Sequence, residues 1–172
     1  LNNVPKTKKE REDQDKPRFI FLIDPLDGTS NAIKNIPAYG MSIAVANVPE
    51  GREATLNDVQ LGFVKNYANG NFYEAIKGNG AKRNGEPMTP SSETDLTKIS
   101  LGGFTKSKTL SVSKLVDTAR RMRVLGSVVL ELAYVASGKY DAFLDLRGSR
   151  IIDIAASKLI VEEAGAIVTD KY

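Results

Sequence analysis

Two carboxylates follow an apolar run near the start of the chain. The run Phe19–Ile23 leads directly into the octapeptide Asp24–Asn31, which reads Asp-Pro-Leu-Asp-Gly-Thr-Ser-Asn. A strand that ends in a Pro/Gly turn brings the side chains of Asp24 and Asp27 to one rim and leaves backbone N–H groups of the turn free. Carboxylates bind hard cations, and free N–H groups bind phosphate oxygens. The octapeptide therefore predicts a site for metal and phosphate.

The composition excludes several other chemistries. The 172 residues contain no histidine and no cysteine. A Ser-His-Asp triad, a Cys-His pair, a His or Cys zinc site and a thiol redox centre each need residues that are absent. Carboxylate, hydroxyl, amine and guanidinium groups remain. A hydrolase built from these groups is expected to recruit Mg2+ or Mn2+, because a bound metal ion acidifies water without a histidine base.

The remaining composition is typical of a soluble protein of one moderate domain. Hydrophobic residues make up 41% and charged residues 26% of the chain, and the net charge of +3 is weak evidence for any partner. The apolar stretches are too short to span a bilayer, and the polar start of the chain has no apolar segment typical of a signal peptide. These features predict a cytoplasmic protein without a membrane partner.

Residues 1–18 form a polar leader in which basic and acidic side chains alternate without apolar periodicity. This pattern indicates an exposed linker or a disordered end. A nucleic-acid-binding arm is the alternative, but the interleaved acids and the missing aromatic residues argue against it. No nucleic-acid partner is therefore expected.

The first half of the chain, residues 19–110, is rich in predicted strands and contains the candidate metal and phosphate site. After Phe19–Ile23, apolar runs predict strands at 42–46, 60–64 and 72–76. The segment Asn69-Gly70-Asn71 is typical of a hairpin, which makes the last two strands antiparallel neighbours. The glycines between Gly78 and Gly85 mark a second tight reversal.

The second half, residues 111–172, alternates strands and helices and is expected to form an α/β subdomain. A strand at 99–101 precedes this half, and further strands are predicted at 122–125, 140–146 and 166–169. Helices are predicted at 111–121, 127–136 and 153–164, with Gly138 and Gly165 ending the last two. Asp153 occupies the N-cap position of the third predicted helix. Antiparallel strands followed by alternating elements predict a layered α+β or α/β sandwich of mixed sheets and helices.

Three blocks of the chain resemble the inositol monophosphatase and fructose-1,6-bisphosphatase superfamily. Asp24–Asn31 is similar to its Asp-Pro-x-Asp-Gly-Thr-x-Asn signature, Gly78–Gly85 to its Gly-x-Gly-Ala-x-x-Asn-Gly segment, and Asp153–Gly165 to its Asp-x-Ala-Ala...Glu-Ala-Gly helix. The stretch Asp145–Arg150 is similar to the archaeal branch, whose members act on both inositol phosphates and fructose bisphosphate. Each block alone has a structural explanation, as a turn, a hairpin or a capped helix. Their shared order favours the family reading.

The resemblance implies a sugar-phosphatase fold and a Mg2+-dependent phosphomonoester hydrolase, with Mn2+ as an alternative metal. Asp24, Asp27, Asp153 and the Leu26 carbonyl would ligate metal. Like charges about 4 Å apart repel by about 4 kcal/mol at an effective dielectric near 20, so three carboxylates need counter-charge. Two Mg2+ ions would change the local charge from −3 to +1 and favour a phosphate dianion. A metal-activated water would attack phosphorus in line, with Thr29 orienting the water.

Several further residues are implied as phosphate or substrate contacts. Backbone N–H groups of Gly28 and Thr29, before a helix expected to begin around Ser30, would hold phosphate oxygens. Gly126, Ser127 and Asp145 would approach the hydroxyls of a sugar or inositol, although one extra residue between Asp145 and Asp153 blurs that match. Arg147 and Arg150 would contact a second phosphate, or would be solvated surface charges. The family also implies a homodimer.

The chain departs from the family pattern at both ends. A metal-binding Glu-Glu motif is expected well before the Asp-Pro-x-Asp turn, but none is present, and Glu10 and Glu12 lie in an unsuitable basic context. The family also continues beyond the position of Tyr172. These differences predict an internal fragment without the N-terminal helical segment and the C-terminal end. A catalytically incomplete domain that binds metal and phosphate, or acts as a scaffold, is thus an alternative, as is a nucleotide 3′-phosphatase of the same superfamily.

Overall fold

The structure is a computed structural model, and it describes residues 18–104 and 112–170. Most of the predicted leader at 1–18, including Glu10 and Glu12, lies outside the described residues. The strands of the described part are β1 (Phe19–Asp27), β2 (Gly40–Asn47), β3 (Val59–Asn66), β4 (Phe72–Ile76), β5 (Ala81–Arg83), β6 (Glu86–Pro87), β7 (Ser100–Phe104), β8 (Arg121–Arg123) and β9 (Ala142–Asp145). The helices are α2 (Thr29–Ile33), the 3-10 helix η1 (Leu56–Asp58), α3 (Ser113–Thr118), α4 (Val128–Ala136) and α5 (Ile151–Glu163).

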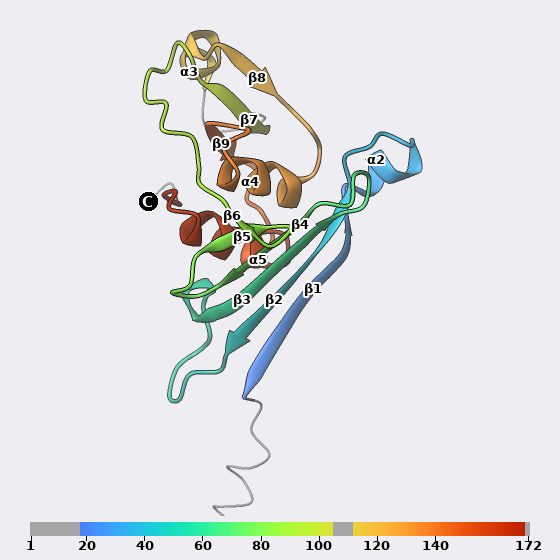
Figure 1. Cartoon of the computed structure of the whole chain (residues 1–172), viewed down its shortest axis with the longest axis vertical. Coiled ribbons are helices and arrows are strands. Elements are labelled where there is room, and N and C mark those ends of the chain that lie inside the picture. The colour runs from blue at the N-terminus through green and yellow to red at the C-terminus, as the bar shows by residue number, and fades with distance from the viewer. Residues whose placement is uncertain (1–17, 105–111, 171–172) are drawn as a thin grey trace, which may run out of the picture.

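The first half of the chain forms an antiparallel sheet in the order β1-β2-β3-β4-β5-β6 (Figure 1). Neighbouring strands are also successive in sequence, so short connections suffice. The predicted hairpin at Asn69-Gly70-Asn71 joins β3 and β4 in antiparallel register. The predicted reversal between Gly78 and Gly85 joins β4 to β5, which are also antiparallel. The strand predictions for this half are therefore confirmed.

Strand β1 runs through Asp27 and does not end at Ile23, as the sequence had suggested. The pairing with β2 shifts between Asp24, which lies opposite Ser42, and Asp27, which lies opposite Gly40. Two residues of β1, Pro25 and Leu26, therefore face one residue of β2, which is a β-bulge. Residues three apart on a regular strand point to opposite faces. The extra residue allows Asp24 and Asp27 to face the same side of the sheet.

A second, parallel sheet has the order β8-β7-β9 and lies beyond the helices at the top of Figure 1. Parallel neighbours need a crossover connection, and here α3 lies between β7 and β8 and α4 between β8 and β9. The predicted helix at 111–121 is shorter in the structure, and Ser111 lies outside the described residues. The change from antiparallel strands to alternating strands and helices confirms the predicted mixture of sheets and helices.

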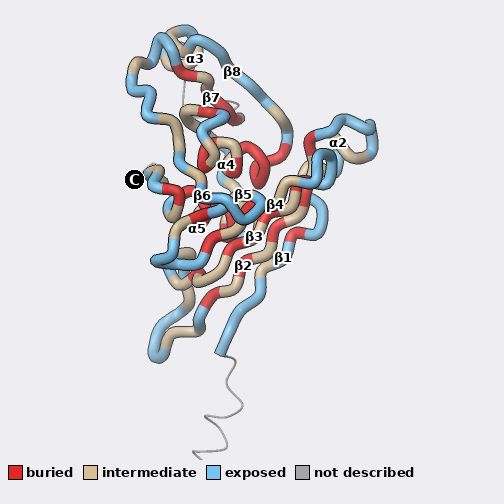
Figure 2. The backbone as a smooth tube through the Cα atoms, in the orientation of Figure 1, coloured by how far each residue is buried: buried red, intermediate tan, exposed pale blue. Residues whose placement is uncertain are grey.

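The core lies between the antiparallel sheet and the pair α4 and α5, which pack against each other and against β2 and β3. Alternate residues of the strands face these helices, and Figure 2 shows their backbone in the colour of buried residues. The inward residues are small where α5 crosses the sheet, including Ala44 and Ala75. Small side chains let the helix come close to the strands. The other face of β1 is open, with Phe19 55% and Phe21 65% exposed.

Two predictions for the second half are wrong. Asp153 is the third residue of α5, whose N-cap is Arg150 in an extended conformation. The apolar residues at 166–169 form no strand, since none of them pairs with another described strand. By contrast, Gly138 follows α4 with a φ of 68°, as expected for a helix-ending glycine. The proposed division at residue 110 into two subdomains stays a prediction.

No helix within residues 18–104 and 112–170 is long and apolar enough to cross a membrane.

Candidate functional site

The segment after the bulge is organised by hydrogen bonds among its own residues. The Leu26 N–H donates to Asp24 Oδ1 at 3.1 Å, and the Thr29 hydroxyl donates to the Leu26 carbonyl at 3.0 Å. Gly28 is the N-cap of α2 with a φ of 79°, and a Cβ there would lie 2.7 Å from the Ala38 carbonyl oxygen. Both its conformation and its surroundings therefore require glycine. The Asn31 and Ala32 N–H groups donate to the Gly28 carbonyl, and helix geometry leaves the earlier N–H groups of Thr29 and Ser30 without acceptors within the helix.

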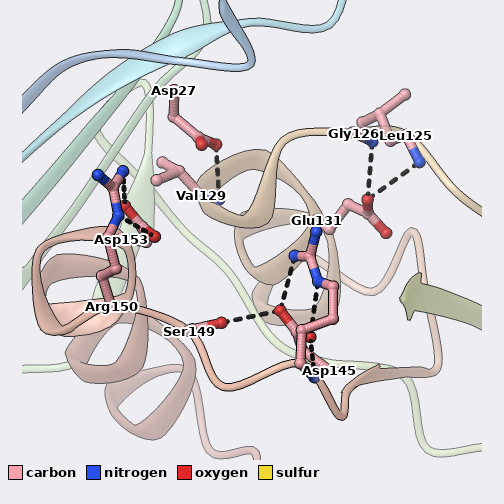
Figure 3. Close-up of polar contacts among 10 residues, drawn as sticks. Asp27, Leu125, Gly126, Val129, Glu131, Asp145, Ser149, Arg150 and Asp153 are labelled. Atoms are coloured by element: carbon pink, nitrogen blue, oxygen red, sulfur yellow. Dashed lines mark hydrogen bonds and ion pairs between the residues drawn. The ribbon is translucent and has the colours of Figure 1, made fainter. Parts of the chain in front are cut away.

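Asp27 is held by the start of a distant helix. Its Oδ2 accepts a hydrogen bond from Ser127 Oγ at 2.5 Å. The same oxygen accepts one from the Val129 N–H at 3.0 Å (Figure 3). Ser127 is the fully buried N-cap of α4, and its hydroxyl oxygen also accepts from the Leu130 N–H at 3.3 Å. The positive end of a helix stabilises a carboxylate at this position. The contact joins two segments that are about one hundred positions apart in the sequence.

Asp153 is held differently, by a charged side chain of its own segment. Both of its carboxylate oxygens accept from the Arg150 guanidinium, at 2.8 Å and 3.1 Å. The Arg150 side chain is 76% exposed, so the pair is screened by solvent. Figure 3 shows the pair at the beginning of α5, on the side where Asp27 comes down from β1.

The pKa values of Asp27 and Arg150 both depend on the charges of the predicted carboxylates around them. Burial raises the pKa of Asp27, the hydrogen bonds from Ser127 and Val129 lower it, and the charges of Asp24 and Asp153 raise it further. The Arg150 guanidinium in turn feels Asp153, then Asp24 and Asp27, and its pKa is raised mainly by the bond to Asp153. Asp24 and Asp153 thus lie near enough to Asp27 for their charges to act on it, and of the three carboxylates Arg150 is bonded to Asp153 alone. The balance leaves an excess of negative charge.

Asp145, Arg147 and Ser149 form a separate cluster after β9. Asp145 accepts two hydrogen bonds from the Arg147 side chain, at 3.0 Å and 2.8 Å, and one from the Ser149 hydroxyl at 2.8 Å. Burial raises the pKa of Asp145, but these bonds outweigh it, so its pKa lies below the ordinary value. The Arg147 guanidinium also stacks on Phe104, with 3.3 Å between its central carbon and the ring centroid. Arg147 is therefore engaged within the protein, although it still feels the charge of Asp153.

The oxygen atoms of the candidate metal-binding side chains suit a hard divalent cation, although they do not surround a single position. The side chains that could hold a metal ion offer only oxygen, which Mg2+ and Mn2+ prefer. In the described part of the chain, no three acidic side chains lie close enough together to hold a metal ion as they stand. Two contacts keep the acidic side chains from converging. Asp27 is directed to the start of α4, and Asp153 is directed to Arg150. The excess negative charge around Arg150 nevertheless favours a cation.

Sequence reasoning missed three contacts of this site. The Val129 N–H is a backbone donor that no residue type reveals. Asn31, which the octapeptide contains, donates to the carbonyls of Ala38 and Leu125, both at 2.8 Å, and so ties the α2 segment to the loop before α4. Glu131 lies fully buried below this loop. A single charged residue within the apolar run Val128–Ala136 was the signal that could have identified it.

Comparison with known proteins identifies the family of the chain. The model of the inositol monophosphatase family matches residues 5–171. A protein of Methanothermobacter thermautotrophicus named fructose-1,6-bisphosphatase/inositol-1-monophosphatase is 58% identical over 160 residues, which cover 91% of this chain and 57% of the relative. A protein of Methanococcus maripaludis named bifunctional NADP phosphatase/NAD kinase is 37% identical over 177 residues, covering 94% of this chain and 31% of that protein.

A solved structure has the same fold. It is a Pyrococcus horikoshii protein described as having similarities to inositol-1 monophosphatase, and it superposes with a TM-score of 0.78 at 37% identity. The match covers 90% of this chain and 57% of that one. The chain thus spans little more than half the length of the Methanothermobacter and Pyrococcus proteins, and less than a third of the Methanococcus protein. The matched family model, the identity and the fold together show that the chain belongs to the inositol monophosphatase family.

Proposed function

We propose that this chain carries the metal and phosphate site of a phosphomonoester hydrolase that acts on inositol 1-phosphate, fructose 1,6-bisphosphate or both. The convergence of Asp24 and Asp27 from β1 with Asp153 from α5 is the observation that carries the proposal. Asp24 and Asp27 are close in sequence, but Asp153 comes from the far end of the chain, and its charge acts on Asp27 despite the cost of like charge. A cluster that is unfavourable for the protein alone is a common sign of a functional site.

The proposed ligands for Mg2+, or Mn2+, are the carboxylates of Asp24, Asp27 and Asp153 and the carbonyl of Leu26. When bound, the cation supplies Lewis-acid chemistry, which acidifies water and stabilises charge on the leaving oxygen. Asp27 would meet the cation in an orientation fixed by Ser127 and Val129. Asp153 would first leave Arg150, and an exposed ion pair of this kind contributes little stability because solvent screens it. The exchange is therefore inexpensive.

The residues around Gly28 would bind and orient the phosphate. The N–H groups of Gly28 and Thr29 lie at the first turn of α2, where helix geometry leaves donors without internal acceptors. The Thr29 hydroxyl donates to the Leu26 carbonyl and keeps two lone pairs that can accept a hydrogen bond from water. Thr29 would thus orient the attacking water towards phosphorus.

The substrate contacts that we propose lie at the start of α4, at the end of β9 and at the start of α5. Ser127 and Asp145 would face the hydroxyls of the sugar or inositol. Of the two arginines, Arg150 is the better candidate for a second phosphate, because Arg147 is held by Asp145 and by Phe104. A homodimer is proposed by analogy with the family alone.

Phosphate release by the purified chain tests the proposal directly. Inositol 1-phosphate, fructose 1,6-bisphosphate, 3′-phosphoadenosine 5′-phosphate and NADP would be compared at several Mg2+ concentrations and in EDTA. We expect Mg2+-dependent release from the first two substrates. Faster release from either nucleotide would instead assign the chain to the nucleotide phosphatases of the superfamily.

A second candidate function is binding without turnover. It is favoured by the absence of a close acidic trio among the described residues and by the 57% coverage of the archaeal relative. Calorimetric titration with Mg2+ and inorganic phosphate separates the two candidates. Binding of both without phosphate release from any substrate would support the incomplete domain and would contradict the enzyme.

A further inference from the structure

Glu131 is a charged residue in the middle of the apolar core. It lies on α4 among apolar neighbours and is 0% exposed. Burial raises the pKa of Glu131, whereas nearby N–H groups of Gly126, Leu125 and Gly103 and the charge of Arg147 lower it. Taking a carboxylate out of water is costly unless it is well paired. Its presence therefore calls for a specific role.

One oxygen of Glu131 holds the loop that leads into α4. Oε1 accepts hydrogen bonds from the N–H groups of Leu125 at 3.0 Å and Gly126 at 3.1 Å (Figure 3). The next residue is Ser127, which caps the helix and donates to Asp27. The carboxylate thus fixes the two residues directly before the group that orients Asp27.

The same loop is held from its other side by the segment that follows Asp27. Asn31 donates to the Leu125 carbonyl at 2.8 Å, so Leu125 is bound at its N–H by Glu131 and at its carbonyl by Asn31. The loop is therefore clamped between a buried carboxylate and the octapeptide. A displacement of the loop would move the Ser127 hydroxyl relative to Asp27.

The second oxygen of Glu131 argues against a purely stabilising role. Oε2 is buried and makes no hydrogen bond of good geometry to the described residues, although the Gly103 N–H is near enough to lower the pKa of the carboxyl. A buried oxygen left unpaired costs about 1–3 kcal/mol. Space for it exists only because residue 102 is glycine, where a Cβ would lie 3.0 Å from Oε2 and 2.4 Å from the Tyr140 ring. For core packing alone, leucine would suit this position better than glutamate.

We propose that Glu131 is a positioning residue, which fixes the Leu125–Gly126 loop so that Ser127 holds Asp27 ready for a divalent cation. This inference rests on the proposed function, in which Asp27 is a metal ligand. Glu131 touches neither metal nor substrate in this role. Its effect is carried by the loop and by Ser127.

Glu131→Leu and Glu131→Gln test the inference in the full chain. Leucine removes both acceptors, whereas glutamine keeps one oxygen for the two N–H groups. Amide hydrogen exchange measured by NMR should show lost protection at Leu125 and Gly126 in Glu131→Leu and near-normal protection in Glu131→Gln. Calorimetric Mg2+ affinity should fall about tenfold in the leucine variant, as for other outer-shell partners of metal ligands, and recover in the glutamine variant. The KM for inositol 1-phosphate at saturating Mg2+ should change less than the Mg2+ affinity.

Glu163→Leu is a matched control. Glu163 also accepts two N–H bonds, from Gly78 and Gly80 at 2.8 Å each, but it joins the end of α5 to the turn between β4 and β5. This variant should lose thermal stability and protection of its own turn while Mg2+ affinity is unchanged. An equal loss of Mg2+ affinity in both leucine variants would overturn the inference, as would unchanged protection at Leu125 in Glu131→Leu.

Two outcomes keep the inference separate from the proposed function. If Glu131→Leu does not fold, Glu131→Asp keeps the charge but is one methylene too short, and it should lose the protection of Leu125 and Gly126 in a folded chain. If the unmodified chain binds no Mg2+, the proposed function fails. Exchange at Leu125 and Gly126 then still decides whether Glu131 holds the loop, and the part of the inference that concerns metal is overturned.

Discussion

The carboxylates of Asp27 and Asp153 are held by different kinds of contact. Asp27 is fixed by neutral donors of another element, the Ser127 hydroxyl and the Val129 N–H, and is partly buried between β1 and α4. Asp153 is paired with Arg150, a solvent-exposed neighbour three positions away on the same segment. One carboxylate is set by tertiary structure, and the other by a local ion pair.

This difference indicates how the cluster can be stable and still bind a cation. Burial raises the pKa of Asp27, and because its neutral hydrogen bonds orient the carboxylate without removing its charge, repulsion from Asp24 and Asp153 raises the pKa further. The Arg150 ion pair neutralises Asp153 but can be exchanged at little cost. Asp27 would thus present its carboxylate to the cation in a fixed orientation. Asp153 would supply its negative charge once the cation displaces Arg150.

Among the variants that test this difference between Asp27 and Asp153, Asp27→Asn should have the largest effect. Asparagine keeps the shape but removes the charge that the cation needs, so we expect phosphate release from inositol 1-phosphate to fall by about a thousandfold or more, ~4 kcal/mol of transition-state stabilisation. Asp95→Asn, an exposed carboxylate between β6 and β7, is the control. Near-normal turnover of Asp27→Asn in Mg2+ would remove Asp27 from the site.

Ser127→Ala tests whether the orientation of Asp27 matters. The change removes the hydroxyl donor to Asp27 and the N-cap of α4, which should cost about 1 kcal/mol of stability. Mg2+ affinity measured by calorimetry should fall about tenfold. Ser137→Ala removes a hydroxyl at the opposite end of α4 and should leave Mg2+ affinity unchanged. If the two variants behave alike, the hydrogen bond to Asp27 has no part in metal binding.

Arg150→Met tests whether the ion pair of Asp153 is only a substitute for metal. Removing the competing cation should lower the half-saturating Mg2+ concentration about twofold, with a stability change within about 0.5 kcal/mol, as for other exposed pairs. Lys98→Met removes another exposed pair of the same spacing and serves as the control. A higher KM for fructose 1,6-bisphosphate with unchanged Mg2+ dependence would instead assign Arg150 to a substrate phosphate.

The smallest expected effect concerns stability without divalent cations. A carboxyl whose pKa is raised in the fold contributes stability that is fully present below its unfolded pKa and is lost as pH rises through the folded pKa. In EDTA, wild-type melting temperature should therefore decline relative to Asp27→Asn as the pH increases from 4 to 8, and Mg2+ should restore it. A difference between the two proteins that does not vary with pH would contradict the raised pKa.

Residue patterns predicted the fold well where local signals and pairing agree. The hairpin at Asn69-Gly70-Asn71 and the end of α4 at Gly138 are both fixed by turn and helix-ending residues. The strand predicted at 166–169 failed because an apolar run becomes a strand only when another strand pairs with it. The cap of α5 was misplaced because an aspartate in the first turn of a helix looks, in sequence, like an N-cap.

The sequence predicted the residue types of the candidate site but not the hydrogen bonds and ion pairs that hold them. Asp24, Asp27 and Asp153 were identified from carboxylate chemistry and family resemblance, and the structure brings them together. The backbone donor at Val129, the ion pair of Asp153 with Arg150 and the clamp around Leu125 depend on tertiary packing. A sequence pattern carries no signal for a backbone donor from a distant helix.

The bulge at Pro25 and Leu26 decides on which face of the sheet Asp27 lies. If all residues of β1 paired with β2 in a regular ladder, Asp27 would lie three positions after Asp24, and the two-residue period of the strand would turn it to the open face of the sheet. Conservative replacement of Leu26, whose carbonyl and N–H form its contacts at the site, would leave the direction of Asp27 unchanged. At this point of the fold, the irregular pairing of the backbone directs Asp27, and the side chains between the two aspartates do not.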